Sequence, residues 1–477
     1  MRIAIVGAGA AAVGLLDALA VSEEETGEVT VFEPSTHLWR GRPYGPDLDR
    51  VLVNVPPAAM SIRHLDSGHY SSWLGAERAA THMDDLFGQP LVPRGLYGEY
   101  LAGTAETALA TLRGRGWRTR VVAARIVAVT RSRGLRLAVY TEDGHEHMAD
   151  QVVLCVGGGT PQDHYGLGGA PGFVGDPYPL ASTLDQVQPG ADVAVIGSGL
   201  TAVDVAVSLA ARGHAGRIAL VSRTGMLPHV YQRPLDYRPR HVTVERVEAL
   251  GREHGGVTLD DLVGLLRAEL AEKGEDFAGF TAELLMARSE EPVQWLRAQL
   301  AAVDDPRIGR RVLQQSAYTV APYAWRLLPE SDRGWLRRHL RLATSVAAPM
   351  VPVNAAALLG LFDSGQLTTA PGVRKIEAVE RGFRVRGDGG DLNADVVVNA
   401  LNPPPQTVPR AAEQLVTSLL ADGLAALYPS GGLAPADPRL HVVGDLAAGS
   451  TFITSGILGV AARAARTAGG LLTTQAG

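Results

Sequence analysis

The alternation of apolar and polar positions indicates two strand–turn–helix–strand units that lie far apart along the chain. Near the start, an apolar run at residues 2–6 ends in glycines, leads into an Ala- and Leu-rich stretch at 10–21, and is followed by a second apolar run at 29–33. The same order returns at residues 192–222. A strand, a tight turn, a helix and a second parallel strand make up one βαβ unit. The pattern therefore predicts two parallel sheets.

The segments between and after these units predict small antiparallel layers and a block of helices. Residues 120–156 and 373–402 alternate apolar and polar side chains around turn signals, which is typical of antiparallel strands. Residues 240–345 lack strand patterns and predict an all-helical insert. Within it, helices are expected at 259–273, 293–302 and 333–342. The tail predicts a last strand at 441–445 and a helix at 455–472, which we expect to return to the first domain.

Composition and charge narrow the class of protein. Of 477 residues, 46% are hydrophobic and 20% charged, which is ordinary for a folded globular chain. A formal net charge of -6 offers no basic surface for nucleic acid or an anionic membrane, so neither partner is expected. No stretch reaches the roughly 18 uninterrupted apolar residues of a membrane span, which predicts a cytoplasmic location.

The cysteine and histidine content bears on disulfide chemistry and on metal binding. Cys155 is the only cysteine, so an intramolecular disulfide and a Cys-x-x-Cys redox pair are excluded, and its apolar surroundings predict a core position. The sequence His145-Glu146-His147 follows the turn signal Asp143-Gly144, and we interpret it as a solvated turn. No metal site is expected.

A glycine motif joins the first predicted strand to the first helix. In Gly7-x-Gly9-x-x-Ala12, glycines permit a tight turn and let a pyrophosphate approach backbone N–H groups at the helix N-terminus. Glu33 ends the next strand, where a carboxylate accepts hydrogen bonds from ribose hydroxyls. The motif predicts a dinucleotide site, with a merely structural turn as the alternative.

A second glycine motif occupies the same place in the second unit. Gly197, Gly199 and Thr201 lie between a strand and a helix, but Ser222-Arg223 stands where the first unit has its acidic residue. A guanidinium there can pair with a 2'-phosphate, which favours NADPH over NADH. Two alternatives stay open: a surface arginine beside an NADH site, and a duplicated domain that has lost its ligand.

Two further strand ends carry glycine. Gly444-Asp445 follows the last predicted strand and precedes a Ser/Thr/Gly-rich turn that contains Thr454, an arrangement that suits the ribityl chain and pyrophosphate of a flavin. Gly157 ends the strand that closes the first antiparallel stretch. A plain strand, turn and helix with an aspartate cap is the alternative for Gly444-Asp445.

Over nearly its whole length the chain resembles bacterial FAD/NAD(P)-binding flavoproteins related to flavin-dependent N-hydroxylating monooxygenases. The resemblance is carried by Gly7-Ala-Gly9, Glu33, residues 41–45, 52–55, 60–61 and 93–100, Gly197-Ser-Gly199, the strand ends near Gly157 and Asn399, and Gly444-Asp445. It implies an α/β fold of two Rossmann-like dinucleotide-binding domains, the first for FAD and the second for NADPH, with a helical insert. The expected divisions are 1–187 and 403–477 for the FAD domain, 188–239 and 346–402 for the NADPH domain, and 240–345 for the insert.

The resemblance also implies candidate site residues. The segment from Tyr44 to Ser61 is expected along the isoalloxazine ring, so that Tyr44, Asn54, Val55 and Met60 contact FAD and Asn54 lies near the reacting atoms. Arg63 and His64 follow directly and are candidates for holding an anionic substrate or the nicotinamide phosphate. Each could equally be a surface residue paired with an acid.

One departure bears on the second cofactor and the substrate. Relatives often carry a His- and Arg-rich stretch before the segment that matches residues 349–361, whereas residues 343–348 here read Ala-Thr-Ser-Val-Ala-Ala. The resemblance then implies that a basic site has been lost, so that the substrate differs or the second cofactor binds differently.

The resulting hypothesis is an FAD-dependent oxidoreductase. NADPH would reduce FAD, the reduced flavin would form a hydroperoxide with O2, and a small amine or amino-acid-like metabolite would be N-hydroxylated. Because the attack demands no separate acid or base, no catalytic dyad is expected. An NADPH-dependent flavin reductase without oxygenation and a non-catalytic FAD-binding partner protein of a biosynthetic complex remain as alternatives. Association into a homo-oligomer also stays open.

Overall fold

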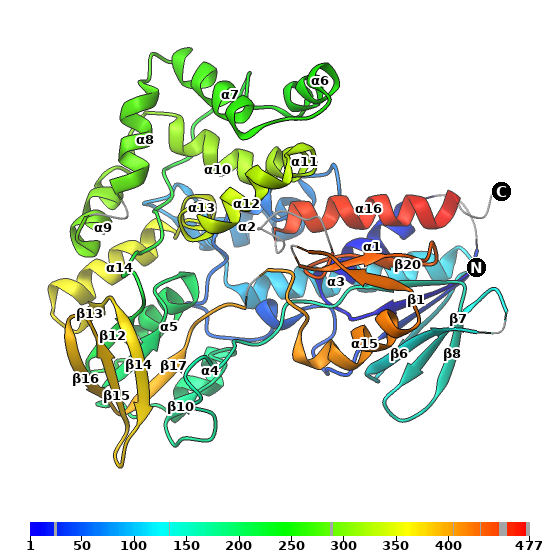
Figure 1. Ribbon diagram of the computed structural model, residues 1–477, viewed down its shortest axis with the longest axis horizontal. Helices are drawn as coiled ribbons and strands as arrows, with labels where there is room; N and C mark the ends of the chain where they lie inside the picture. The colour runs from blue at the N-terminus through cyan, green and yellow to red at the C-terminus, as the bar shows by residue number, and fades with distance from the viewer. Residues whose placement is uncertain are drawn as a thin grey trace.

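Two parallel sheets and a block of helices organise the molecule (Figure 1). The computed structural model describes residues 1–22, 26–132, 134–286, 290–403, 405–429, 431–447 and 456–473. In Figure 1 the first sheet lies at the right and the second at the lower left, and the helices of residues 244–347, which the chain inserts between two strands of the second sheet, lie across the top. The predicted fold class is confirmed.

The first sheet is entirely parallel and has the strand order β20-β9-β1-β2-β5. Its strands are β1 (Arg2–Val6), β2 (Glu28–Phe32), β5 (Arg118–Val122), β9 (Gln151–Leu154) and β20 (Leu440–Val442). Ile3 and Ile5 face a core that includes helices α1 (Ala10–Val21), α3 (Arg94–Gly114) and α16 (Ile457–Thr473). Ala4 and Val6 face the opposite core, because successive strand side chains point to opposite faces. Helices cover one face of this sheet, and smaller strands together with a short helix at residues 413–421 cover the other.

The tail of the chain completes the first unit. Strand β20 pairs in parallel with β9, with Leu440 opposite Val152, and α16 packs against α1. The red and blue helices lie side by side in Figure 1. The chain therefore leaves the first unit after β9 and re-enters it before β20, since Leu415, Val416 and Leu419 already lie in the core of that unit.

The second sheet repeats this architecture in the order β10-β17-β11-β12-β13, again with parallel pairing throughout. Its strands are β10 (Phe173–Val174), β11 (Val193–Ile196), β12 (Ile218–Val221), β13 (Leu367–Ala370) and β17 (Val396–Asn399). Helices α5 (Leu200–Ala211) and α14 (Pro352–Asp363) share a core with one face. The antiparallel strands β14 (Val373–Ala378), β15 (Phe383–Gly387) and β16 (Gly390–Ala394) cover the other.

The antiparallel layers are shorter than the sequence pattern predicts. In the first unit the layer consists of β6 (Ile126–Arg131), β7 (Leu137–Thr141) and β8 (Glu146–Ala149). The flanking strands β5 and β9, and β17 in the second unit, belong to the parallel sheets. Placing them in the antiparallel stretches was wrong, because short buried strands look alike in sequence whichever sheet they join.

The described residues between 244 and 347 form helices joined by loops, with no strand among them. The helices are α6 (Val244–His254), α7 (Leu259–Ala271), α8 (Phe277–Met286), α9 (Pro292–Ala301), α10 (Gly309–Thr319), α11 (Ala321–Leu327), α12 (Glu330–Arg338) and α13 (Leu340–Ala347). The single helix predicted at 333–342 is wrong. The chain breaks at His339, which has φ −104° and ψ 18° and whose ring stacks on Trp335 with centroids 4.1 Å apart.

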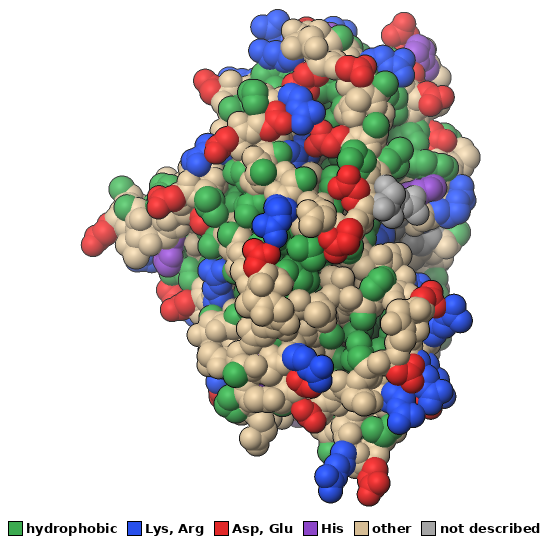
Figure 2. All heavy atoms as spheres, turned by 90° about the vertical axis from the view of Figure 1, so that its left-hand side faces the viewer, with side chains coloured by type: hydrophobic (Ala, Val, Ile, Leu, Met, Phe, Trp, Pro, Cys, Tyr) green, Lys and Arg blue, Asp and Glu red, His purple; other side chains and the backbone are tan. Residues whose placement is uncertain are grey.

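Shorter elements fill the connections. They are the 3-10 helices η1 (Arg42–Tyr44), η2 (Pro57–Ala59), η3 (Leu184–Gln186) and η4 (Arg410–Ala412), the helices α2 (His69–Thr81), α4 (Leu180–Thr183) and α15 (Glu413–Ala421), and the strands β3 (Met83–Asp84), β4 (Gln89–Pro90), β18 (Ala425–Leu427) and β19 (Leu433–Pro435). Among the described residues, none of the helices has the length and apolar character needed to cross a membrane. Acidic and basic side chains are interspersed over the face shown in Figure 2.

Candidate functional site

The first glycine turn is packed so tightly that its first position admits only glycine. Gly7 has φ +100°, and its N–H donates to the carbonyl of Phe32 at 2.9 Å. A Cβ added there would lie 2.6 Å from the carbonyl oxygen of Cys155 at the end of β9. Gly9 is the N-cap of α1, and a Cβ on it would lie 3.7 Å from the Cα of Gly41. The turn thus closes against two neighbouring segments.

The N-terminus of α1 is suited to an anionic group. Gly9 provides no side-chain cap, so the first backbone N–H groups of this 12-residue helix are open to a ligand. Ala12 is fully buried one turn in, which explains why alanine serves where a third glycine is common. The glycine turn and the N-terminus of α1 therefore fit the pyrophosphate of a dinucleotide.

Glu33 lies directly beside this turn. One of its carboxylate oxygens accepts the N–H of Ala8 at 2.9 Å, and the other accepts the N–H of Ser35 at 2.9 Å. These contacts fix the carboxylate at the end of β2, close to the glycine turn. The position is the one from which an acidic side chain reaches ribose hydroxyls in this kind of fold.

The ends of β9 and β20 meet the first turn of α1. Gly444 has φ +97°, and a Cβ on it would lie 3.4 Å from the Cβ of Ala11. A Cβ on Gly158 would lie 3.4 Å from a carboxylate oxygen of Asp445, whereas Gly157 borders open space. Thr454 lies outside the described residues. The structure thus brings Gly157, Gly444 and Asp445 to the same sheet edge as the glycine turn.

The segment expected along the flavin ring is partly buried. Tyr44 packs edge-on against Tyr97 with ring centroids 4.7 Å apart, and burial raises the pKa of the Tyr44 hydroxyl to about 12. Met60 is 4% exposed, and its carbonyl accepts the Tyr97 hydroxyl at 2.9 Å. Val55 packs partly against the apolar cluster around Leu52. Packing within the protein therefore positions this segment.

Asn54 carries an unsatisfied acceptor. Its side-chain oxygen is buried and has no hydrogen-bond partner among the described residues. A buried acceptor without a partner costs about 1–3 kcal/mol, so a ligand or an ordered water is expected to donate to it.

Arg63 is engaged by an acid. Its Nε and Nη2 donate to the two carboxylate oxygens of Asp17 at 3.1 and 2.8 Å, and Asp17 is 4% exposed. The bond to Asp17 raises the pKa of the Arg63 guanidinium. Burial and then the nearby Arg466 lower the pKa of His64. The geometry favours an arginine paired with an acid, and the catalytic roles of Arg63 and His64 stay predictions.

The second glycine turn is built like the first. Gly197 has φ +116°, its N–H donates to Val221 at 2.8 Å, and a Cβ on it would lie 3.3 Å from the carbonyl oxygen of Ala400. Gly199 is the N-cap of α5, again without a side-chain cap. Thr201 donates to the side chain of Asn402 at 3.3 Å, so this turn also meets the end of a neighbouring strand.

At the end of β12 the side chains are polar and basic. The hydroxyl of Ser222 accepts the N–H of Gly225 at 2.9 Å and lies 3.3 Å from the hydroxyl of Ser198 in the glycine turn. Arg223 is exposed, and no described carboxylate lies within ion-pair distance of it. The predicted residues Gly197, Gly199, Thr201, Ser222 and Arg223 therefore surround one strand edge.

Sequence reasoning missed Arg341, which α13 brings to the same edge. Its Nη2 donates to the hydroxyl of Ser198 at 2.7 Å and to the carbonyl of Met226 at 2.6 Å. Its Nη1 lies 3.7 Å from where a Cβ of Gly199 would be. Residues 343–348 carry no basic side chain, but this region still supplies a guanidinium. Only the tertiary placement of the insert reveals it.

A largely buried ion pair joins the two units. Arg94 of α3 donates to the carbonyl of Leu52 at 3.0 Å, to the Tyr178 hydroxyl at 2.9 Å and to the carboxylate of Asp204 in α5 at 2.6 Å. The Asp204 side chain is 1% exposed and that of Arg94 13%. These contacts fix the two units relative to each other near the proposed flavin segment.

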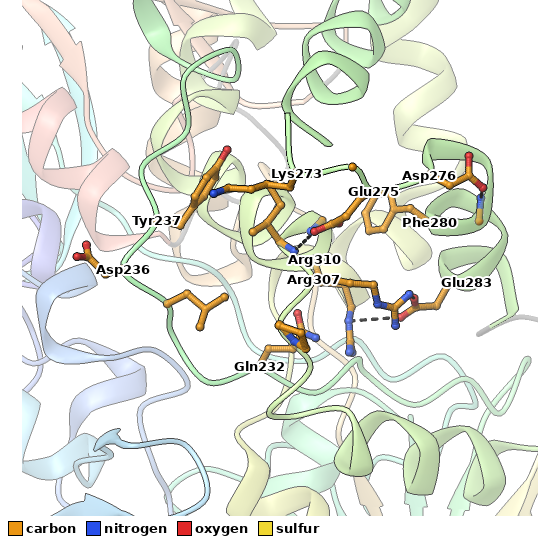
Figure 3. A pocket seen from close by; sticks show the side chains of 16 residues that line it. Gln232, Asp236, Tyr237, Lys273, Glu275, Asp276, Phe280, Glu283, Arg307 and Arg310 are labelled. Carbon is orange, nitrogen blue, oxygen red and sulfur yellow. Dashed lines mark hydrogen bonds and ion pairs between the residues drawn. The ribbon is translucent and has the colours of Figure 1, made fainter. Parts of the chain in front are cut away.

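A cavity of about 760 Å³ is lined by residues of the insert and by residues 232–237, which precede it (Figure 3). Several of its charged side chains have partners within its own wall. Glu275 accepts the N–H of Gly309 at 3.2 Å, Glu283 pairs with Arg307 at 3.0 Å, and Lys273 lies over the Tyr237 ring at 5.1 Å. Since no glycine-turn residue lines this cavity, we place the candidate site at the sheet edges.

Comparison with known proteins agrees with the predicted class of FAD/NAD(P)-binding proteins. Residues 4–159 match a family model described as FAD-NAD(P)-binding, which covers the first glycine turn, Glu33 and Gly157. The match supports the predicted dinucleotide cofactors and the flavoprotein class. Among curated proteins, none matches this sequence.

Several solved structures share the fold over the whole chain. Ornithine hydroxylase (PvdA) from Pseudomonas aeruginosa is 14% identical, with 99% of this chain and 98% of that chain covered and a TM-score of 0.59. L-lysine 6-monooxygenase from Pseudomonas syringae is 16% identical, with 99% of each chain covered and a TM-score of 0.57. The FAD-bound cadaverine monooxygenase DfoA from Erwinia amylovora is 13% identical, with 97% and 92% covered and a TM-score of 0.56. The predicted resemblance is confirmed at the level of the fold.

Proposed function

We propose that this protein is an FAD- and NADPH-dependent monooxygenase that N-hydroxylates a small amine or amino-acid-like metabolite. The observation that carries the proposal is the pair of glycine turns, one at the edge of each parallel sheet, each opening onto an uncapped helix N-terminus. The first turn has an acidic partner, Glu33, and the second has a basic one, Arg223. This asymmetry supports two different dinucleotides.

The residues of the first unit would hold FAD. The backbone of Gly7 and Gly9 would receive the pyrophosphate, and Glu33 would accept a ribose hydroxyl. When bound, FAD supplies hydride acceptance and activation of O2. The protein itself positions the groups and excludes water, which the burial of Tyr44 and Met60 supports.

The second unit would hold NADPH in the same manner. Gly197 and Gly199 would receive its pyrophosphate at the N-terminus of α5, and Arg223 would face its 2'-phosphate. The ion pair between Arg94 and Asp204 holds this unit against the first, so the two nucleotides would meet across a fixed boundary.

An amine is the proposed substrate class for two reasons. The solved structures of similar fold are named for ornithine, lysine and cadaverine, all of which carry amines. The unsatisfied oxygen of Asn54 could accept an N–H from such an amine or from the flavin. An uncharged amine is itself the nucleophile, so no acid–base pair is needed at the site.

The test is anaerobic mixing of the flavin-loaded protein with NADPH or NADH, followed by oxygen and an amine. The panel consists of ornithine, lysine and cadaverine, and products are analysed by mass spectrometry. We expect loss of the visible absorbance of oxidised flavin with NADPH, then gain of one oxygen atom in one of the amines. Reduction with hydrogen peroxide as the only product across the panel would instead support a flavin reductase. Failure of both nucleotides to reduce the flavin would support a non-catalytic FAD protein.

A further inference from the structure

Two arginines from distant parts of the sequence lie near the carboxyl end of β12. Arg223 directly follows this strand, and Arg341 comes from α13 of the helical insert. Burial, and then the nearby charge of Arg223, lower the pKa of Arg341. Neither guanidinium is within ion-pair distance of a carboxylate in the part of the chain that the structure describes. Two like charges without an acid repel each other, and an anion between them would relieve the repulsion.

The contacts of Arg341 place it on the ribose side of the glycine turn. It donates to the Ser198 hydroxyl at 2.7 Å, and that hydroxyl lies 3.3 Å from the hydroxyl of Ser222 at the end of β12. It also donates to the carbonyl of Met226, four residues past Ser222. In a Rossmann-like unit the pyrophosphate lies at the helix N-terminus, and the adenosine ribose lies over the end of the second strand. Arg341 is thus anchored between the glycine turn and the segment that follows the second strand.

Ser198 explains why the guanidinium is fixed there. Its side chain is fully buried, and its hydroxyl also donates to the Met226 carbonyl at 2.9 Å. One end of the Arg341 guanidinium is thus tied to the protein, and Nη1, which lies 3.7 Å from the Cβ position of Gly199, borders the turn. A pre-positioned guanidinium loses little freedom when it binds a phosphate.

We propose that Arg341 is a specificity-determining residue that, together with Arg223, clamps the 2'-phosphate of NADPH between the second sheet and the helical insert. The inference rests on the proposed function, since it requires a dinucleotide in the second unit. It adds a second phosphate ligand, and it makes the insert part of the coenzyme site. Discrimination against NADH would then depend on a helix that lies outside the βαβ unit.

The test measures nucleotide binding by calorimetry on the full-length, flavin-loaded protein. The probes are NADP+, NAD+, 2',5'-ADP and 5'-AMP, and the variants are Arg341→Gln, Arg341→Lys and Arg223→Gln. A charged hydrogen bond to phosphate is worth enough that Arg341→Gln should weaken NADP+ and 2',5'-ADP by about tenfold to a hundredfold. NAD+ and 5'-AMP should bind as before. Arg341→Lys keeps the charge without the planar fork and should fall between.

Arg252→Gln is the matched control. Arg252 is another arginine of the insert, its side chain is 72% exposed, and it lies in α6 beside Glu248. Removing its charge should leave the binding of all four probes unchanged. Melting temperature and flavin content are measured for every variant, and if Arg341→Gln does not fold, the lysine variant carries the test.

Other outcomes would overturn the inference in distinguishable ways. Equal weakening of NADP+ and NAD+ would assign Arg341 to the pyrophosphate, and unchanged NADP+ binding would remove it from the site. In both cases the wild-type protein still prefers NADP+, so the proposed function stands. A wild-type protein that binds neither nucleotide, or that prefers NAD+, would refute the proposed use of NADPH and the clamp together.

Discussion

Gly7 is the residue whose replacement the first site tolerates least. Its positive φ and the 2.6 Å approach of its added Cβ to the Cys155 carbonyl oxygen would force the turn away from β9. We expect Gly7→Ala to destabilise the protein by about 1–3 kcal/mol and to abolish FAD retention. Flavin content after gel filtration and urea unfolding check this.

Gly264 provides the contrast for that substitution. It lies inside α7, and nothing lies within 4 Å of a Cβ added to it. Gly264→Ala should leave flavin content unchanged and stabilise the protein by up to about 1 kcal/mol, because alanine is the better helix former. Equal flavin loss in both variants would contradict the requirement for glycine at position 7.

Glu269 is a buried carboxylate that organises the start of the insert. It is 0% exposed and accepts backbone N–H groups of Arg240, His241 and Val242 at 2.7 to 3.0 Å, together with the Tyr237 hydroxyl. Burial opposes ionisation, but these donors outweigh it and lower the pKa of Glu269. The charged form is therefore part of the folded structure.

Replacing Glu269 should give a pH-dependent loss of stability. In Glu269→Gln an amide N–H₂ faces backbone donors, so we expect a loss of about 1–3 kcal/mol at pH 7. A carboxyl with a lowered pKa contributes stability above its unfolded-state pKa, and this contribution is lost as the pH falls through the folded-state value. The gap between variant and wild type in urea unfolding should therefore narrow on acidification below about pH 4. A gap independent of pH would contradict the role of the charge.

At the scale of elements, α3 and α5 are joined by the ion pair of Arg94 and Asp204. Removing one member of a buried pair leaves the other charge uncompensated, at a cost of about 3–5 kcal/mol. Arg94→Met should cause a loss of this size in the free energy of unfolding. The double variant Arg94→Met/Asp204→Leu should recover part of it, because no buried charge remains. A double variant less stable than the single one would show that the pair is not coupled.

The sequence predicted best those elements that are defined by neighbours in the chain. Helix α1 and strand β2 follow from the apolar runs that flank Gly7 and Gly9, and the second unit repeats that local sequence pattern. The ends of the antiparallel layers and the break at His339 were not predictable, because they depend on which sheet a strand joins and on how the Trp335 ring packs. Arg341 was missed for the same reason, since its contacts with Ser198 and Met226 span most of the second unit.

At the scale of the whole molecule, the first domain depends on the end of the chain. Helix α16 covers α1 through Ile457, Val460, Ala464, Ala468 and Leu471, all of which are buried. A chain that ends at residue 455 would expose this surface of α1 to water. We expect it to bind a hydrophobic dye and to retain no FAD. A shortened chain with full flavin content and an unchanged melting curve would contradict this.

The second unit is attached to the first at two points, once after β9 and once before β20, and not through a single linker. Two attachments define a line, so rigid motion of one unit against the other reduces mainly to rotation about that line. The ion pair between Arg94 and Asp204 joins the two units and would resist this rotation. Cutting either connection alone would allow further rigid motions of one unit against the other, while the remaining connection keeps the two units linked.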